Sequence, residues 1–526
     1  MLKKDTFYCS LTVISLRIPW DLYVQGELPA LLAGSLIVPT NRRNKDRRFF
    51  SRWHDSQTDL IRLDLYPGRP GRVQAHILAV DPSGADLGDG FRRGEFERRA
   101  YGQLASYGYA TQPNHGVNIA GDTLWATNLL FGAPLEVDLV TWKPRRILRY
   151  VDLHELAPRM SGTSHFAWSL DHRYAYFHQS LLQCESPGSP VRAADLCLIE
   201  MDVHSGGERI WKLLPPPEDD GLETANFHSG FYFEEDGKCY IGLLRTGVLL
   251  EGLAPHSAPV DHTVLPLPPS TIWIVELDYE KSTLQAQLLP GIRELDGLAL
   301  SHLDVDASSG DGFILYANFK EADVAEETHG ENLYGEEPEE VAEHYSGMIV
   351  EALNYGMVIR YERRGGQTSV RTFKRPYVPG MTSLGHSWLP INIELDPAKR
   401  RLFCTFSGFR PRLLSRHIAA AYPNRVVDPA TIRNVPPLLM RFDAATLVPE
   451  YDQNRGHLSY AEPIAMTVAG DGNTDYVCTF SPEVGLRIYL ADDLNHMVCY
   501  AESPSLMHWR DSHFRPEPAH MQFVHR

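Results

Sequence analysis

Short runs of apolar and β-branched residues, each bounded by glycine, aspartate, asparagine or proline, recur along most of this chain. Runs of this length between turn-forming residues predict β-strands rather than helices. Turns such as Ala120-Gly-Asp, Glu235-Asp-Gly and Ser309-Gly-Asp each precede such a run. The clearest runs are Leu60–Leu65, Thr123–Thr127, Arg173–His178, Leu196–Asp202, Lys238–Leu243, Thr271–Leu277, Gly312–Phe319, Met357–Tyr361, Arg401–Phe406 and Leu486–Leu490. The pattern therefore predicts an all-β protein.

Repetition of a turn and a strand over several hundred residues favours a β-propeller, in which small antiparallel sheets repeat radially and few strand edges stay exposed. A chain of 526 residues is long enough for several domains or for one closed architecture, and we expect a single domain, residues 1–526. Helical patterns are few, and Pro411–Ala421 and Glu337–Glu343 are predicted to be excursions between blades. We expect such helical and loop segments to form a cap over one face.

The net charge limits the partners of the chain. Its 50 basic and 67 acidic residues leave a formal charge of −17, so the average surface repels the phosphate backbone of nucleic acid. We therefore expect no nucleic-acid partner. The acidic segment from Glu321 to Glu343 is interpreted as a solvated surface loop rather than a cation site.

The cysteines and the N-terminus bear on the compartment. Seven scattered cysteines without a CxxC pair argue against a disulfide framework and a zinc site, and indicate a reducing compartment. Arg17 interrupts the first apolar run and no clean small-residue cleavage site follows, which disfavours a secretory signal. No stretch reaches the roughly 20 apolar residues of a membrane-spanning helix. We expect a cytoplasmic protein and leave contact with a membrane surface open.

Three of the 22 histidines share a local construction. His165, His228 and His302 each stand at the start of a strand-like run that is followed by a short turn and a second apolar run. The innermost strand of each propeller blade lines the central axis, so histidines placed alike on three blades would converge on one point. Neutral imidazoles suit Fe, Cu or Zn, whereas Mg or Ca would require oxygen ligands. Structural zinc usually recruits cysteine, and none is near in sequence.

The sequence lacks the motifs of other catalytic chemistries, and the residues that would suit them have simpler structural explanations. The chain has no G-x-S-x-G nucleophile elbow, and no Walker A or G-x-G-x-x-G sequence before a helix. Asp304 and Asp306 beside His302 would suit a hydrolytic metal site, but their alternation favours one face of a strand end, with a capping or exposed role. Aromatic residues near the histidines would line a tunnel or pack in the core: Phe166, Trp168, Phe227, Phe231 and Trp388.

Longer phrases surround these histidines and together resemble one known family. The segment from Val24 to Leu36 resembles the opening phrase G-x-L-P-x-x-L-x-G-x-L, and Ala461-Glu-Pro-Ile resembles the motif E-P-I/V. His520-Met-Gln-Phe-Val is similar to the terminal F-H-G-L-F-V. The chain thus resembles the carotenoid cleavage oxygenases, which include apocarotenoid oxygenases, the retinoid isomerase of the retinal pigment epithelium and lignostilbene dioxygenases. Spacings of 63, 74 and 218 residues separate four histidines as in that family: His165, His228, His302 and His520.

The resemblance implies a seven-bladed β-propeller with one Fe(II) ion on its axis. The four histidines would hold the ion, and Glu462 would hydrogen-bond to one of them from outside the coordination sphere. His513 is the alternative fourth ligand, because Ala519 and Met521 depart from the terminal motif of the family.

Two further carboxylates of the family have no counterpart here. The segment Leu124-Trp-Ala-Thr-Asn-Leu contains no carboxylate, and Asn128 could replace the expected glutamate only as a neutral hydrogen-bond partner. Ser387 stands at the position of the other glutamate. Loss of such partners usually lowers metal affinity or activity by roughly 10- to 100-fold unless other groups compensate.

The resemblance implies an Fe(II)-dependent dioxygenase that cleaves a carbon–carbon double bond of a carotenoid or apocarotenoid with O2 and releases two carbonyl products. The substrate would be an apolar alkene bound in a tunnel beside the metal. One alternative is cleavage of a stilbene-like or other phenylpropenyl alkene, although the lysine with which lignostilbene members meet a phenol is absent. The other is a catalytically decayed propeller binding module, which the missing carboxylates favour. The oligomeric state is open.

Overall fold

The structure, a computed structural model, describes residues 14–16, 20–44, 57–69, 71–80, 116–127, 134–148, 160–163, 165–184, 191–218, 227–245, 271–291, 298–308, 310–321, 356–375, 389–407, 438–454, 465–481, 485–502, 514–518 and 520–525. Within these ranges the chain is almost entirely β-strand, and its one helical element is the 3-10 helix η1 (Ala30–Leu32). No helix in this part has the length and apolar character needed to cross a membrane. The all-β prediction is confirmed, and the predicted helices Pro411–Ala421 and Glu337–Glu343, with the cap, lie outside the described residues.

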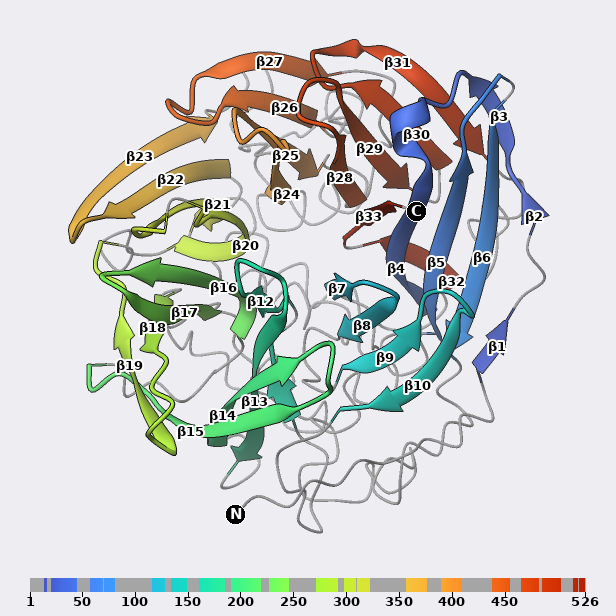
Figure 1. Ribbon diagram of the computed structural model, residues 1–526. Coiled ribbons are helices and arrows are strands. Elements are labelled where there is room, and N and C mark those ends of the chain that lie inside the picture. Colours follow the sequence, from blue (N-terminus) through green and yellow to red (C-terminus); the bar gives the residue numbers. More distant parts are fainter. Residues whose placement is uncertain are drawn as a thin grey trace, which may run out of the picture.

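Antiparallel sheets stand side by side around a central axis in a propeller, as predicted (Figure 1). Three sheets have four strands each and a fourth has five, because β3 (Tyr23–Gly26) from near the N-terminus joins it. Their other strands are β7 (Gly116–Ala120), β8 (Thr123–Thr127), β9 (Leu135–Asp138) and β10 (Lys143–Ile147); β20 (Leu298–Asp306), β21 (Phe313–Glu321), β22 (Gly356–Arg364) and β23 (Gln367–Arg375); β24 (Leu389–Leu395), β25 (Arg401–Ser407), β26 (Leu438–Asp443) and β27 (Pro449–Asn454); and β28 (Ala465–Gly470), β29 (Asp475–Ser481), β30 (Gly485–Leu490) and β31 (Asp493–Glu502).

A nine-stranded sheet combines two groups of strands. Their strand ladders join where β15 runs parallel to β19 over three residue pairs, from Lys212 opposite Thr283 to Leu214 opposite Gln285. The count of seven blades depends on dividing this sheet at that contact, and it stays a prediction. The strands are β11 (Met160–Gly162), β12 (Ala167–Trp168), β13 (Tyr174–Cys184), β14 (Val191–Asp202) and β15 (Glu208–Leu214), then β16 (Phe227–Glu235), β17 (Lys238–Arg245), β18 (Thr271–Glu276) and β19 (Thr283–Leu288).

Strands from both ends of the chain close the ring. The N-terminal β3 pairs with β31, while two C-terminal strands pair with β4 along the edge of the first sheet that faces the axis. Exchange of strands between the first and last sheets ties the ends of the ring without a covalent bond. The first sheet consists of β1 (Ile14–Leu16), β2 (Trp20–Asp21), β4 (Gly34–Asn44), β5 (Gln57–Tyr66), β6 (Arg72–Val80), β32 (Phe514–Pro518) and β33 (Gln522–His525).

Tight turns join alternate pairs of strands. Asp236 and Gly237 connect β16 to β17 with φ values of 52° and 72°, the left-handed conformation that a two-residue hairpin requires and that the sequence Asp-Gly favours. Successive strands alternate in direction, so such turns gather at one end of the sheets and the longer connections join them at the other. His228 is the second residue of β16, and the tight turn follows the last, Glu235. The histidine therefore lies near the end with the longer connections.

Apolar cores fill the seams between neighbouring blades. Phe231 and Phe233 of β16 contact Phe313 of β21, with ring centroids 4.9 and 4.7 Å apart. Burial of one such side chain contributes about 1.5–3 kcal/mol to folding. At the rim of this seam the guanidinium of Arg363 donates to both carboxylate oxygens of Glu235, with Nη2–Oε2 at 2.7 Å. The interface thus combines an apolar interior with an ion pair, between Arg363 and Glu235, at its rim.

Replacement of Arg363 by alanine should destabilise the propeller, because it leaves Glu235, whose side chain is 5% exposed, without its cation. We expect a loss of roughly 2 kcal/mol in the free energy of unfolding, less than for a fully buried pair because Arg363 is 23% exposed. Urea unfolding of Arg363→Ala and of Arg364→Ala, whose side chain is 46% exposed, measures the difference. Equal midpoints for the two variants would contradict this role.

Candidate metal centre

All four predicted histidines lie where the innermost strand of a sheet is interrupted. His228 is an extra residue in the pairing of β16 with β17, and His302 lies in the bulge of β20 against β21. His165 falls between β11 and β12, which both pair with β13. His520 falls between β32 and β33, which both pair with β4. Such irregularities change the direction of a side chain that in a regular strand would point into the interface between two blades.

The four imidazole rings form a nearly square arrangement. In chain order around the square, the centroids are 5.2, 4.8, 4.5 and 4.3 Å apart. The diagonals are 6.5 Å between His165 and His302 and 6.1 Å between His228 and His520. Four segments separated by up to 355 residues therefore deliver their rings to one point, as the sequence predicts.

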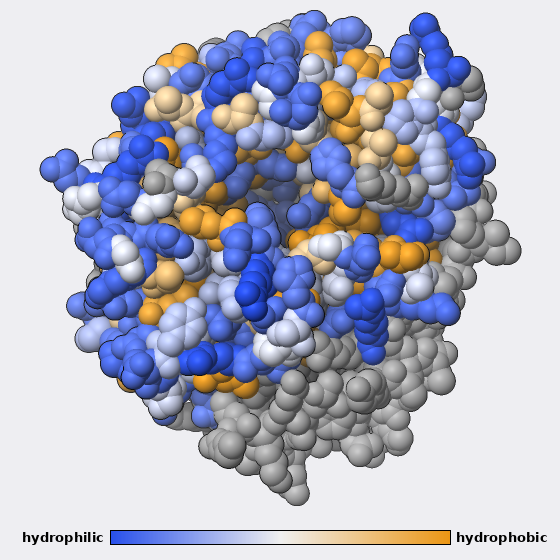
Figure 2. Space-filling view, viewed as in Figure 1, coloured by the Kyte–Doolittle hydropathy of each residue, from blue (hydrophilic) through white to orange (hydrophobic). Residues whose placement is uncertain are grey.

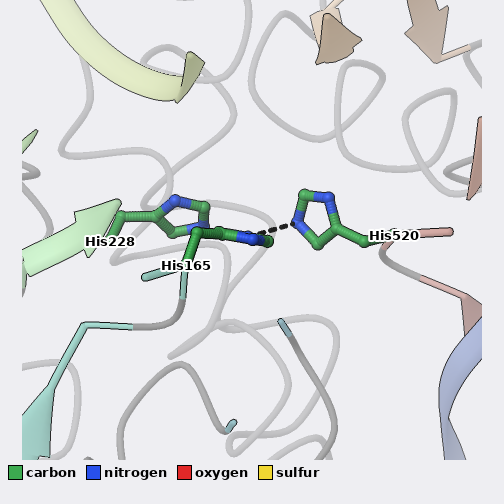
Figure 3. A group of neighbouring side chains, drawn as sticks. All are labelled: His165, His228 and His520. Atoms are coloured by element: carbon green, nitrogen blue, oxygen red, sulfur yellow. Dashed lines mark hydrogen bonds between the residues drawn. The ribbon is translucent and has the colours of Figure 1, made fainter. Parts of the chain in front are cut away.

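The ring nitrogens of three histidines converge most closely. Those of His165, His228 and His520 lie within 4.8 Å of one another, and the Nε2 atoms of His165 and His520 are 3.2 Å apart (Figure 3). Burial lowers the pKa of His165 to about 4, so its ring is neutral at physiological pH and keeps a lone pair for a metal ion. The neutral imidazole is the form that binds a metal.

Backbone hydrogen bonds hold two of these histidines in register. The N–H of His165 donates to the carbonyl of His228 at 3.0 Å, and the N–H of Gly230 donates to the carbonyl of His165 at 2.8 Å. This parallel bridge joins two neighbouring parts of the ring directly at the site. The packing is tight there, because a Cβ atom on Gly230 would approach the Ala167 nitrogen to 3.2 Å and require a small shift of that backbone. The separation of the two histidines is thus fixed by the main chain.

A serine orients the ring of His228. Its Nδ1 atom lies 2.9 Å from the hydroxyl oxygen of Ser229, and both residues are buried. When Nδ1–H donates to this hydroxyl, the lone pair of Nε2 is left to face the other rings. Histidines that bind metals typically use their second nitrogen in this way, and the bond fixes the tautomer.

These distances fit one transition-metal ion. Half of each diagonal is about 3.1 to 3.3 Å. A metal roughly 2.1 Å from a ring nitrogen stands about 3.2 Å from the ring centroid, so an ion at the centre would be within reach of every ring. An all-nitrogen donor set suits Fe, Cu or Zn and not Mg or Ca.

Several predicted participants lie outside the described residues: Glu462, His513, Asn128, Ser387 and Trp388. Their roles stay predictions. Among the aromatic candidates, Phe166, Phe227 and Phe231 are buried in three different cores between blades, and Trp168 packs against the first of these cores. These four rings therefore contribute to the cores, which was the simpler of the two interpretations.

Carboxyl groups lie farther along the inner strands. Asp304 accepts hydrogen bonds from the N–H groups of Val305 and Leu395, each at 2.7 Å, and Asp306 accepts from Ser308 and pairs with Lys399. Both aspartates thus serve at a strand end, as the alternation of the sequence indicates. The carboxyl of Glu394 accepts a hydrogen bond from the Thr467 hydroxyl at 2.8 Å. Burial, with a smaller contribution from the charge of Asp304, raises the pKa of Glu394 to about 8.

Sequence reasoning did not single out Ser229, Gly230 or Glu394. Ser229 had a detectable signal, since a hydroxyl directly follows a predicted ligand. The other two depend on contacts between strands of different blades, for which a single sequence contains no local pattern.

Comparison with solved structures relates this fold to known proteins, although no protein-family model and no curated protein sequence matches the chain. A Synechocystis apocarotenoid oxygenase mutant with a Glu-to-Asp change is 14% identical and superposes with a TM-score of 0.53. An ACO/RPE65 chimera is 12% identical with a TM-score of 0.51, and cobalt-substituted Synechocystis ACO is 13% identical with a TM-score of 0.50. Each match covers 97% of this chain and 96% of the other. The resemblance to carotenoid cleavage oxygenases is thereby confirmed at the level of the fold.

Replacement of Ser229 by alanine should weaken metal binding. The Nδ1 atom of His228 would lose its hydroxyl partner, and loss of such a partner typically lowers metal affinity by roughly 10-fold or more. Competition with a chromophoric chelator measures the affinity, and Ser180→Ala, which removes another buried hydroxyl, is the control. Unchanged affinity in Ser229→Ala would show that the hydroxyl does not orient the ligand.

Glu394 should make the stability of the protein depend on pH. Its pKa is raised from 4.5 to about 8 in the folded state, so between these values the folded protein holds a proton that the unfolded chain has released. The free energy of unfolding therefore falls as the pH rises through this window, with a slope from this group of at most about 1.4 kcal/mol per pH unit. Urea unfolding between pH 5 and 9 should show a shallower decline for Glu394→Gln than for the exposed control Glu280→Gln. Parallel profiles would contradict the assignment.

Proposed function

We propose that this protein binds one Fe(II) ion through His165, His228, His302 and His520 and cleaves a carbon–carbon double bond of a carotenoid or apocarotenoid with O2. Each carbon of the alkene would receive one oxygen atom, so two carbonyl products account for both atoms of O2. The observation that carries the proposal is the nearly square arrangement of four imidazole rings on the axis. Solved apocarotenoid oxygenases that share this fold over almost the whole chain support it.

The ion, when bound, would supply a site at which O2 is activated. The chain contributes ligands that stay neutral, since burial keeps the pKa of His165 well below physiological pH. Donation from Nδ1–H of His228 to the Ser229 hydroxyl would leave Nε2 for the ion, and the bridge between His165 and His228 sets the spacing of two ligands. Apolar cores on both sides of the inner strands limit access of water to the rings.

An apolar substrate is consistent with the surface around the axis. On the face shown in Figure 2, hydrophobic residues border the hollow near the middle of the ring, while hydrophilic residues cover most of the periphery. A long polyene needs such an apolar approach, because it offers almost no hydrogen-bonding groups. A stilbene-like alkene would instead require a polar partner for its phenol.

Metal analysis and substrate trials test the proposal together. Protein purified without added iron should take up about one equivalent of Fe(II) and then consume O2 with β-apocarotenals but not with resveratrol. Cleavage of resveratrol alone would favour the phenylpropenyl alternative. No iron, and none restored by added Fe(II), would leave the decayed binding module as the better description.

Substitution of a ligand should abolish turnover in the iron-loaded protein. His228→Ala removes one corner of the square together with its link to Ser229, and we expect at least 100-fold lower turnover with less bound iron. The control is His204→Ala, because His204 is exposed in a turn between β14 and β15. Activity retained by His228→Ala would show that the ligand assignment is wrong.

A further inference from the structure

Asn118 of β7 makes two hydrogen bonds beside the metal centre. Its Oδ1 atom accepts the N–H of Phe166 at 2.6 Å, and its Nδ2 group donates to the carbonyl of Trp125 at 3.3 Å. The side chain is 3% exposed. The orientation of the amide is determined by its neighbours, since an N–H requires the oxygen and a carbonyl requires the NH2 group.

The hydrogen bond to Phe166 completes the support of the segment that carries His165. The ladder of β13 pairs with β11 up to Gly162 and with β12 from Ala167, so the described residues between them, Thr163, His165 and Phe166, lie outside regular pairing. The N–H and carbonyl of His165 bond to the strand that carries His228, and the next N–H, that of Phe166, bonds to Asn118. Strands β16 and β7 thus hold three consecutive hydrogen-bonding groups around this ligand.

A neutral amide suits this position better than a carboxylate. Asparagine can accept from Phe166 and donate to Trp125 at once, whereas aspartate would place a buried charge beside a carbonyl oxygen. The segment in which the resemblance leads us to expect a carboxylate begins at Leu124 on β8, the strand that accepts the hydrogen bond of Asn118, and the carboxylate position itself lies outside the described residues. Asn118 acts on the peptide behind the ligand rather than on its ring.

From this geometry we infer that Asn118 is a positioning residue of the metal centre, which fixes the direction of the His165 ring by holding the His165–Phe166 peptide. The inference rests on the proposed function, because it requires that His165 bind a metal ion. A purely structural role would affect stability alone. A positioning role changes the affinity and the ligand field of the bound metal.

A matched pair of variants separates these roles. Asn118→Ala removes the bonds beside His165. Thr405→Val removes an equivalent buried bond, from the Asn392 N–H to the Thr405 hydroxyl at 3.1 Å, at the bulge of β24, where no predicted ligand lies. Both should lower the unfolding midpoint. Only Asn118→Ala should lower Co(II) and Fe(II) affinity, by roughly 10- to 100-fold, and shift the visible absorption bands of the Co(II) form.

Two further variants complete the experiment. Asn118→Asp keeps the acceptor for Phe166 and should retain the Co(II) spectrum of the wild type in a less stable protein. Asn118→Ser, whose hydroxyl does not reach the Phe166 N–H, replaces Asn118→Ala if that variant does not fold. Metal affinity and spectrum equal to those of Thr405→Val would overturn the inference while leaving the proposed function intact. Failure of the wild-type protein to bind either ion would overturn both.

Discussion

The interrupted innermost strand is the feature on which the rest of this structure depends. A regular strand in a propeller directs alternate side chains into the two flanking seams, where they pack in apolar cores. An extra residue breaks this alternation. At four positions around the ring, the residue outside the regular pairing is a histidine or directly adjoins one. Each interruption leaves some backbone N–H and C=O groups outside the strand ladder. The hydrogen bonds that these groups make to other parts of the chain hold the site together.

The closing strands link the metal centre to the integrity of the ring. β32 and β33 pair with β4 and extend the first sheet toward the axis, and His520 stands between them. The other three histidines come from sheets formed in the middle of the chain. The set is therefore complete only when the C-terminal strands are docked. This explains how His520, 218 residues beyond His302, reaches the same point.

Much of this architecture follows from local sequence. Turns such as Asp236-Gly237 have residues suited to positive φ, and the apolar runs between turns give the strands their length. The shared construction around His165, His228 and His302 predicts a strand start for each, but the structure places only His228 there, whereas His302 lies within β20 and His165 lies between β11 and β12. The bulges cannot be recognised in the sequence, because the segment Phe227-His-Ser, which contains one extra residue, has the residue pattern of an ordinary strand. Asn118 is likewise invisible in sequence, since its partner Phe166 is 48 residues away on another sheet.

The hydrogen-bond partner that the structure shows for the ring of His228 is the neutral hydroxyl of Ser229. A carboxylate that accepts from an imidazole raises its basicity, whereas a hydroxyl does so less. Affinity then depends more on how well the rings are held in place before the ion arrives. The main-chain bridge between His165 and His228 provides that rigidity without charge.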